Sequence, residues 1–287
     1  MNYGVIDIGS NSVRLMISDE LKTLHKYVKT TRLAEGIGKD KIIKPDPMER
    51  TVQTFSSFYK RVKEEFGVEK VYAFATAAVR QSINGNDFIF RVKELCGLDV
   101  DVISGETEAK IGLVGALNGK DGGIIDVGGA SSEVTVSVKG KDLYGKSLPI
   151  GAVKLKDECG QDKDIARQYI LNKIKEFGNI PNVEFFAIGG TATSLAAIAQ
   201  ELEPYDSSKT DGYTLTVENL KELVDKLYIL SVDQRKKLKG LQPERAEVIA
   251  GGALLLLLIV EKIVLKKIIV SEKDNLEGYL MLKMEKI

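Results

Sequence analysis

The sequence predicts an α/β protein built from two related halves. Apolar strand-like runs alternate with amphipathic helical stretches along the chain. A strand that ends in aspartate, a glycine turn and a returning strand occur twice, at 3–17 and 122–138. The runs VIDIGS (5–10) and IIDVGG (124–129) match in residue type, which indicates an internal repeat. The length of 287 residues also favours two domains over one.

The first half begins with three expected antiparallel strands. Apolar alternation predicts strands at Tyr3–Asp7 and Val13–Ile17, and a third near Thr23–Lys29. We expect Pro45 and Pro47 to break the chain after this meander. The elements that follow are a helix from Met48 to Phe66 ended by Gly67, a strand at 68–74, a helix capped by Asn86 and Asp87 that ends before Gly97, and a strand at 98–103.

The second half is expected to repeat the strand pattern and then to add helices. The expected elements are strands at 122–126 and 132–138, a helix at 164–177 ended by Gly178, a strand at 184–188, a third glycine turn at 189–191, and helices at 192–202, at 217–227 capped by Thr216, and from a capping box of Ser231 and Gln234. The uncharged run 248–260 is shorter than a bilayer-spanning helix, so we expect a buried core helix there.

The composition excludes several classes of function. Apolar side chains make up 44% of the chain, and 41 basic residues balance 41 acidic ones, which is typical of a globular protein and not of a polybasic nucleic-acid binder. The lone His25 excludes a two-histidine metal site, and Cys96 and Cys159 are too few for a zinc cluster or a disulfide framework. Because the start lacks a signal-peptide layout, we expect a cytoplasmic protein with no DNA, RNA or membrane partner.

The repeated aspartate and glycine turn carries the candidate chemistry. Glycines let backbone N–H groups approach an anion closely, and a carboxylate held beside them can bind the divalent cation of a phosphate. A single turn of this kind more often has only a structural role. Two such turns opposed across a cleft would place Asp7, Asp126 and several backbone donors around one phosphate chain.

Six motifs occur in a fixed order: DIGSNSVR (7–14), ATAAVR (75–80), SGETEA (104–109), DVGGASSE (126–133), SLPIGAV (147–153) and GGTAT (189–193). In this order they resemble the exopolyphosphatase/guanosine pentaphosphatase (Ppx/GppA) family of the actin, Hsp70 and sugar-kinase superfamily. The resemblance implies two ribonuclease-H-like domains with mixed sheets, flanking helices and an interdomain cleft. We expect the first domain at 1–116, completed by a C-terminal helix at about 273–287, and the second at 117–272.

The resemblance also implies an activity and a site. The implied activity is Mg²⁺-dependent release of the terminal phosphate from polyphosphate or guanosine pentaphosphate. Guanosine tetraphosphate is a further expected ligand, and a homodimer is one expected assembly. Glu108 looks like the catalytic base, Glu133 is a second catalytic candidate, and Asp7, Asp126 and Glu133 resemble the metal residues. The expected phosphate-binding residues are Gly9, Ser10, Asn11, Arg14, Arg80, Gly128, Gly129, Ala130, Ser131, Gly189, Gly190, Thr191 and Arg245.

Two residues depart from the family pattern. Ala130 stands where the family usually has glycine, and a Cβ penalises positive φ by roughly 1 kcal/mol or more. Leu276 stands where arginine is usual, so we expect weaker binding of long polyanions. Two alternatives stay open: an ATP-dependent small-molecule kinase of the same superfamily, and a regulator that binds the alarmone without turnover.

Overall fold

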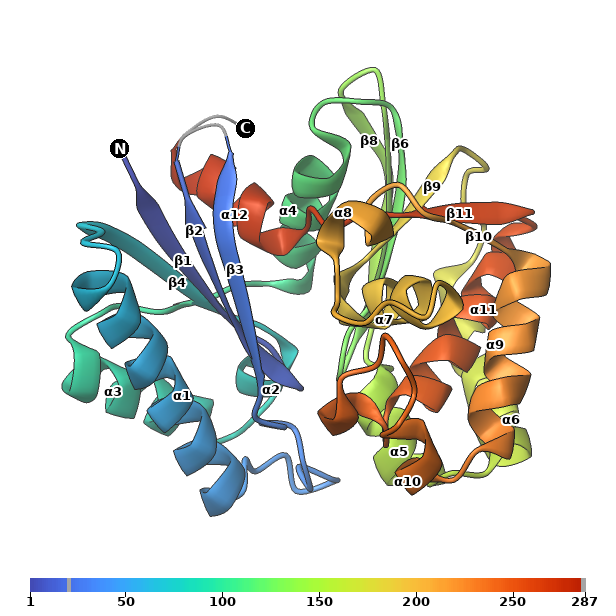
Figure 1. The fold of residues 1–287 in the computed structure, drawn as a ribbon, viewed down its shortest axis with the longest axis horizontal. Helices are drawn as coiled ribbons and strands as arrows, with labels where there is room; N and C mark the ends of the chain where they lie inside the picture. The colour runs from blue at the N-terminus through green and yellow to red at the C-terminus, as the bar shows by residue number, and fades with distance from the viewer. Residues whose placement is uncertain (20–21, 285–287) are drawn as a thin grey trace.

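Two mixed sheets form the framework of the molecule (Figure 1). The computed structural model describes residues 1–19 and 22–284. The strands of the first sheet are β1 (Tyr3–Ile8), β2 (Ser12–Ser18), β3 (Thr23–Thr30), β4 (Lys70–Ala75) and β5 (Asp101–Val102), in the order β3-β2-β1-β4-β5. Strands β1, β2 and β3 pair antiparallel, whereas β4 and β5 run parallel to β1.

The second sheet repeats this arrangement and adds an edge strand. Its strands are β6 (Gly122–Val127), β7 (Ser132–Val138), β8 (Lys141–Leu148), β9 (Phe185–Ile188), β10 (Thr214–Thr216) and β11 (Lys267–Val270), in the order β10-β11-β9-β6-β7-β8. Strands β6, β7 and β8 pair antiparallel, and β9 and β11 run parallel to β6. The predicted fold of two ribonuclease-H-like domains is therefore confirmed, while the limits at 116/117 and 272/273 stay predictions.

The internal repeat is visible in the register of the strands at both glycine turns. In the first sheet, Asp7 on β1 lies opposite Arg14 on β2. In the second sheet, Asp126 on β6 lies opposite Glu133 on β7. Each aspartate therefore lies one residue before the end of a central strand, with its partner on the neighbouring antiparallel strand, and each strand runs one residue past its predicted end.

Helices flank both sheets (Figure 1). Those of the first half are α1 (Pro45–Glu64), α2 (Ala77–Arg80), α3 (Gly85–Cys96) and α4 (Gly105–Leu117). Those that follow are α5 (Ala152–Cys159), α6 (Lys163–Ile174), α7 (Gly189–Ala199), α8 (Ser207–Thr210), α9 (Val217–Ile229), α10 (Val232–Arg235), α11 (Ile249–Ile263) and α12 (Asn275–Lys283), with 3₁₀ turns at Lys175–Phe177 and Pro243–Arg245.

Several expected boundaries in the first half are wrong. Helix α1 begins at Pro45 itself, because proline suits the first turn, where its missing N–H would have no helical partner. Helix α3 begins at Gly85, with Asn84 in the N-cap position, two residues before the first of the expected capping residues, Asn86 and Asp87. The expected strand at 98–103 is reduced to the two residues of β5.

The second half differs from the expectation mainly at its third glycine motif. Helix α7 begins at Gly189, so the motif is the first turn of a helix and not a separate loop. Strand β8 has no counterpart in the sequence analysis, because its run KDLYGKSL is mostly exposed and lacks apolar alternation. The capping residues Thr216 and Ser231 are confirmed, each in a capping box at the start of a helix.

The uncharged run at 248–260 is a core helix, as predicted. Residues 254–260 of α11 are each no more than 3% exposed. Burial of one such leucine contributes about 1.5–3 kcal/mol relative to exposure, so α11 anchors the second half. Within residues 1–19 and 22–284, no helix combines the length and apolar character needed to cross a bilayer.

Helix α12 returns from the second sheet to the first. It packs against α4 so closely that a Cβ on Gly278 would lie 1.7 Å from the carbonyl oxygen of Ile111. Its side chains Leu276 and Tyr279 are buried in a cluster with Phe74 of the first sheet. The position where the family usually has arginine is thus a core position here. Residues 285–287 of the expected C-terminal helix lie outside the described residues.

Candidate active site

Two glycine turns face each other between the sheets. In both turns, β1–β2 and β6–β7, the N–H of the first glycine, Gly9 or Gly128, donates to the carbonyl oxygen three residues later over 3.0 Å. A Cβ on Gly129 would lie only 2.8 Å from the Cβ of Ser10. The opposed arrangement that the repeat predicts is therefore present.

The expected backbone strain at Ala130 does not occur. Neither Ala130 nor its neighbours Gly128 and Gly129 has a positive φ, so a Cβ carries no penalty there. The close approach of neighbouring residues explains the glycine at 129 instead. Ser10 lies against Gly129, and Gly151 packs so closely on the other side that a Cβ on Gly151 would lie 2.5 Å from the carbonyl oxygen of Gly129. The strain argument against phosphate binding at this turn is wrong.

A pocket of about 90 Å³ lies between the two turns. The predicted site residues that line it are Asp7, Gly9, Ser10, Asn11, Arg14, Glu108, Asp126, Gly128, Gly129, Ser131, Gly189, Gly190, Thr191 and Arg245. Arg80, Ala130 and Glu133 are not among its lining residues. The structure therefore brings most of the predicted site together from both halves of the chain.

Glu108 enters the pocket from the first turn of α4. The side chain of Ser104 caps this helix by accepting the N–H of Thr107. The carboxylate of Glu108 is 7% exposed and accepts a hydrogen bond of 3.0 Å from Arg80, which also donates to the carbonyl oxygen of Ile103. Burial raises the pKa of Glu108 to about 7, although Arg80 opposes the shift. A carboxyl group with this pKa can exchange a proton near neutral pH.

Asp126 and Glu133 add negative charge beside Glu108. Burial raises the pKa of Asp126 to about 7, with Glu108 contributing as a like charge. Burial also raises the pKa of Glu133 well above its usual range, and both neighbouring carboxylates add to the shift. The hydroxyl of Ser147 donates to Glu133 over 2.6 Å. This group of carboxylates is stabilised when it holds protons or a cation.

Arg14 is bound by carboxylates on two sides. Its Nε donates to Oδ2 of Asp7 over 2.8 Å, its Nη2 donates to the same oxygen, and its Nη1 donates to Oδ2 of Asp274. The two carboxylates raise the pKa of Arg14 above its already high value, against the effect of burial. The charge of this guanidinium is therefore neutralised within the protein.

Arg245 differs from Arg14 in having no counter-ion. It makes no ion pair with any of the described residues, and its Nε donates only to Gln242 over 3.3 Å. Burial and the neighbouring Arg14 lower the pKa of Arg245 to about 10. Its guanidinium lies against Gly190, where a Cβ would come 2.0 Å from Nη1. A half-buried cation that forms no ion pair among the described residues is a binding group for an anion.

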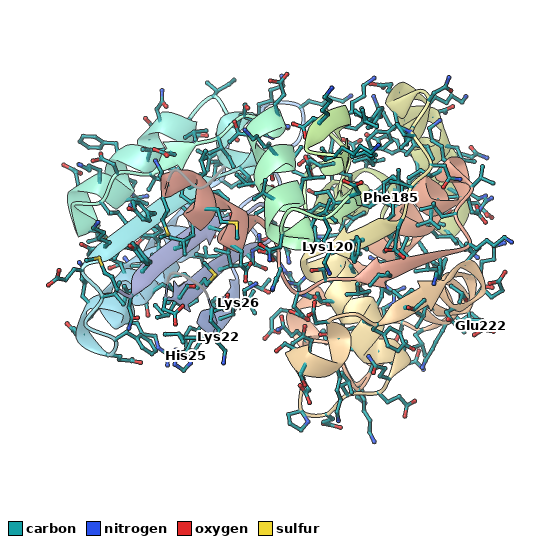
Figure 2. All side chains as sticks on the ribbon, turned by 90° about the horizontal axis from the view of Figure 1, so that it is seen from above. Lys22, His25, Lys26, Lys120, Phe185 and Glu222 are labelled. Carbon is teal, nitrogen blue, oxygen red and sulfur yellow. The ribbon has the colours of Figure 1, made fainter. Side chains whose placement is uncertain are left out.

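A wider cavity of about 1240 Å³ adjoins the pocket. The two share Arg14, Gly189, Gly190 and Arg245. On the side of the first sheet the cavity is lined by residues of β3 and the chain before it, among them Lys22, His25 and Lys26, which Figure 2 shows in one group. His25 belongs to this wall, where its ring lies 5.1 Å from that of Phe66. It does not line the smaller pocket between the two turns, which we call the phosphate-sized pocket.

Sequence reasoning missed three residues of the site. Asn275 lines the pocket, and its Oδ1 is buried without a hydrogen-bond partner among the described residues, as is Oδ1 of Asp7. Asp274 binds Arg14, and Ser147 binds Glu133. All three lie in segments that resemble family motifs. The role of Asp274 depends on packing against a residue 260 positions away, and that of Ser147 on the register of two neighbouring strands, neither of which the sequence alone reveals.

Curated relatives match almost the whole chain. It is 29% identical to a bifunctional 3-dehydroquinate synthase/phosphatase of Fusobacterium nucleatum, over 96% of this chain and 46% of that protein. It is 27% identical to exopolyphosphatase 2 of Mycobacterium tuberculosis, over 95% of both chains. It is 28% identical to the guanosine-5'-triphosphate,3'-diphosphate pyrophosphatase of Photobacterium profundum, over 99% of this chain and 60% of that one. The chain thus spans about half of the first relative and less than two thirds of the third.

A solved structure shares the whole fold. The Ppx/GppA family member of Aquifex aeolicus superposes with a TM-score of 0.80 at 32% identity, and the match covers 100% of this chain and 98% of that one. The sequence profile of the Ppx/GppA phosphatase family matches residues 11–287, a range that begins within the first glycine turn and includes the second turn and the helix that carries Glu108. The protein belongs to the Ppx/GppA phosphatase family.

Proposed function

We propose that the protein is a phosphohydrolase that removes the terminal phosphate from inorganic polyphosphate or guanosine pentaphosphate. The observation that carries this proposal is Glu108, a buried carboxyl group with a pKa of about 7 at the wall of a pocket formed by two opposed glycine turns. Relatives named for these two substrates support it. The pocket's volume of about 90 Å³ suits one terminal phosphate and a water, with the rest of the substrate in the adjoining cavity.

The residues around the pocket suit the charge of a phosphoryl group. Arg245 supplies a cation that forms no ion pair with the described residues, and the two turns supply neutral N–H donors other than those of Gly9 and Gly128, which donate within the turns. The short loops hold these donors in place before the substrate arrives. Preorganised donors of this kind stabilise the charge that develops as the phosphoanhydride bond breaks.

The oxygen atoms of the pocket fit Mg²⁺. Asp7 and Asp126 line it, and Oδ1 of Asp7 and of Asn275 is buried without a partner among the described residues. Those residues include no group of three or more His, Cys, Asp or Glu side chains spaced to hold an ion. This agrees with the usual Mg²⁺ site, in which one or two carboxylates act together with substrate phosphates and waters. A bound Mg²⁺ would neutralise charge on the phosphoryl oxygens. Glu133 stays a predicted ligand.

The proposed reaction is an in-line attack of water on the terminal phosphorus. A bond forms between the water oxygen and phosphorus while the bond from phosphorus to the bridging oxygen breaks, and the electron pair leaves with the shortened chain. Glu108 accepts the proton of the water, and Arg80 orients its carboxylate by the 3.0 Å hydrogen bond. The products are orthophosphate and a substrate shorter by one phosphate.

The test is phosphate release from polyphosphate and from guanosine pentaphosphate, measured stoichiometrically with and without Mg²⁺. We expect one orthophosphate per bond broken, and release that depends on Mg²⁺. Turnover only with ATP and an acceptor would point to a superfamily kinase instead. Binding of either substrate without release would indicate a regulator.

A further inference from the structure

Arg14 donates hydrogen bonds to only one of the two carboxylate oxygens of Asp7. An arginine beside a carboxylate usually binds both oxygens through two parallel hydrogen bonds. Here Nε and Nη2 of Arg14 converge on Oδ2 of Asp7, and Oδ1 of Asp7 has no partner among the described residues. The third nitrogen, Nη1, binds Asp274. When Arg14 binds Asp274 in this way, its guanidinium is oriented so that Oδ1 of Asp7 receives no hydrogen bond from it.

Asp274 is itself fixed by the start of α12. It is the N-cap of this helix, and its Oδ1 accepts the N–H of Leu276 over 2.9 Å while its Oδ2 faces Arg14. Its own N–H donates to Glu277 over 3.0 Å, which completes a capping box. The two oxygens of Asp274 therefore have separate tasks, one in the helix and one toward Arg14.

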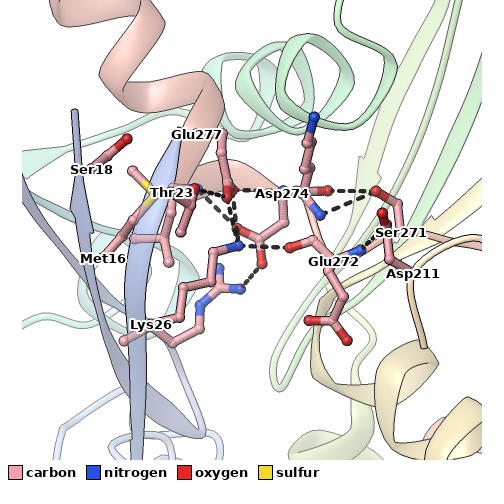
Figure 3. Close-up of polar contacts among 12 residues, drawn as sticks. Met16, Ser18, Thr23, Lys26, Asp211, Ser271, Glu272, Asp274 and Glu277 are labelled. Atoms are coloured by element: carbon pink, nitrogen blue, oxygen red, sulfur yellow. Dashed lines mark hydrogen bonds and ion pairs between the residues drawn. The ribbon is translucent and has the colours of Figure 1, made fainter. Parts of the chain in front are cut away.

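Residues of β3 hold this capping box in place (Figure 3). Lys26 forms an ion pair of 2.8 Å with Glu277 and donates to the carbonyl oxygen of Glu272 over 2.6 Å. Thr23 donates to Glu277 over 2.8 Å. The chain that crosses from β11 to α12 is thereby tied to the first sheet, and Asp274 is held at a set distance from Arg14.

We propose that Asp274 is a positioning residue: it holds Arg14 on Oδ2 of Asp7 and so keeps Oδ1 of Asp7 free at the pocket. Asp274 does not line the pocket between the two turns, although it lines the adjoining cavity, and the proposed action on the pocket is through Arg14. Without this contact, Nη1 loses its partner, and the guanidinium can turn to bind both oxygens of Asp7. The consequence for turnover rests on the proposed function, whereas the geometry of Arg14 does not.

The variant D274N removes this contact together with the longer ion pair of 4.0 Å between Oδ1 of Asp274 and Lys26, and the double variant with R14Q separates the two effects. Asparagine is as good an N-cap as aspartate, so Oδ1 can still accept the N–H of Leu276. Its amide group then faces Arg14, and an N–H₂ cannot accept a hydrogen bond from a guanidinium. The matched control is D162N at the N-cap of α6, where Asp162 accepts the N–H groups of Asp164 and Ile165 far from the pocket.

We expect D274N to lower kcat about 10- to 100-fold, the range for a misplaced site group, with KM changed less than threefold. Its melting temperature should follow that of D162N, which keeps full activity. In an R14Q background, D274N should have no further effect, because its partner is already gone. A crystal structure of D274N should show Arg14 bound to both oxygens of Asp7.

Several results would overturn the proposal. Arg14 still bound to Oδ2 alone in the D274N crystal structure would do so, as would an equal loss of activity in the R14Q background. A raised KM with unchanged kcat would assign Asp274 to substrate binding. If the wild-type protein releases no phosphate from either substrate, the proposed function fails in its own assay, and the crystal structure of D274N still decides how Arg14 is held.

Discussion

Glu133 occupies in the second sheet the position that Arg14 occupies in the first. Each lies directly opposite the aspartate that ends the central strand, Asp7 for Arg14 and Asp126 for Glu133. The same backbone scaffold therefore places a cation beside one aspartate and a second carboxylate beside the other. This difference makes the second half of the site the one that gathers negative charge, and it lets one duplicated element serve two chemical tasks.

Replacing Glu108 by glutamine tests the base directly. The variant keeps the size of the side chain and its contact with Arg80 but cannot accept the proton of water. We expect turnover to fall at least about 10²-fold while the affinity for polyphosphate changes little. Steady-state phosphate release and equilibrium binding measure the two effects. Near wild-type turnover would reassign the base, with Glu133 as the next candidate.

The pH dependence of the reaction should report the pKa of Glu108. Because the base must be unprotonated, kcat/KM should rise with pH along a limb centred near 7. Arg80 lowers this pKa, so the variant R80Q should move the limb to higher pH. A pH–rate profile of both proteins is the measurement. A limb that stays in place in R80Q contradicts the assignment to Glu108.

The stability of the protein without ligand should fall as the pH rises. The pKa values of Glu108 and Asp126 are raised to about 7 from ordinary values of 4.5 and 3.8, so the folded state binds more protons than the unfolded state between these limits. Their stabilising contribution is full below pH 4 and is lost as the pH passes 7. Thermal melts from pH 5 to 8 should show this decline, and E108Q should flatten it. A melting temperature of the wild-type protein that rises from pH 5 to 8 would refute the explanation by buried carboxyl groups.

Arg245 should control substrate affinity more than turnover. A hydrogen bond to a charged group contributes about 1.5–3 kcal/mol, so R245Q should raise KM about 10- to 100-fold. The variant G190A should act in the same direction, because the new Cβ would lie 2.0 Å from Nη1 of Arg245. The surface variant R91Q, which breaks an exposed ion pair with Glu49, is the control. An unchanged KM in both R245Q and G190A would remove Arg245 from the binding site.

The sequence predicts the central parts of the site because they lie in local repeats. Asp7 and Asp126 each end an apolar strand before a glycine turn, and the pairing of neighbouring strands follows from that pattern alone. The start of α7 at Gly189 could not be predicted in this way, because glycine has a low helix propensity. Gly189 has a positive φ and lies so close to Asp126 that a Cβ would come 2.6 Å from its Oδ1. Strand β8 was missed because its residues face solvent on an edge of the sheet.

The role of Asp274 could not be predicted from sequence patterns. It is separated from Arg14 by 260 positions, and the two meet only because α12 folds back onto the first sheet. Ser147 and Glu133 lie only 14 positions apart on neighbouring antiparallel strands, and their pairing depends on the register of β7 and β8, which the exposed sequence of β8 does not indicate. Local patterns identify which residues can do chemistry, whereas long-range packing decides which partner each one has.

Because α12 packs on the first sheet, the first half of the protein cannot complete its fold until the C-terminal helix has been synthesised. The ribosome makes the first sheet early, but the helix that covers Phe74 and contacts α4 emerges only after the entire second sheet. Until then, the nascent first half exposes an apolar patch that a chaperone can recognise. Premature termination before Asp274 would leave that patch open and would also remove both Asp274 and the amide oxygen of Asn275.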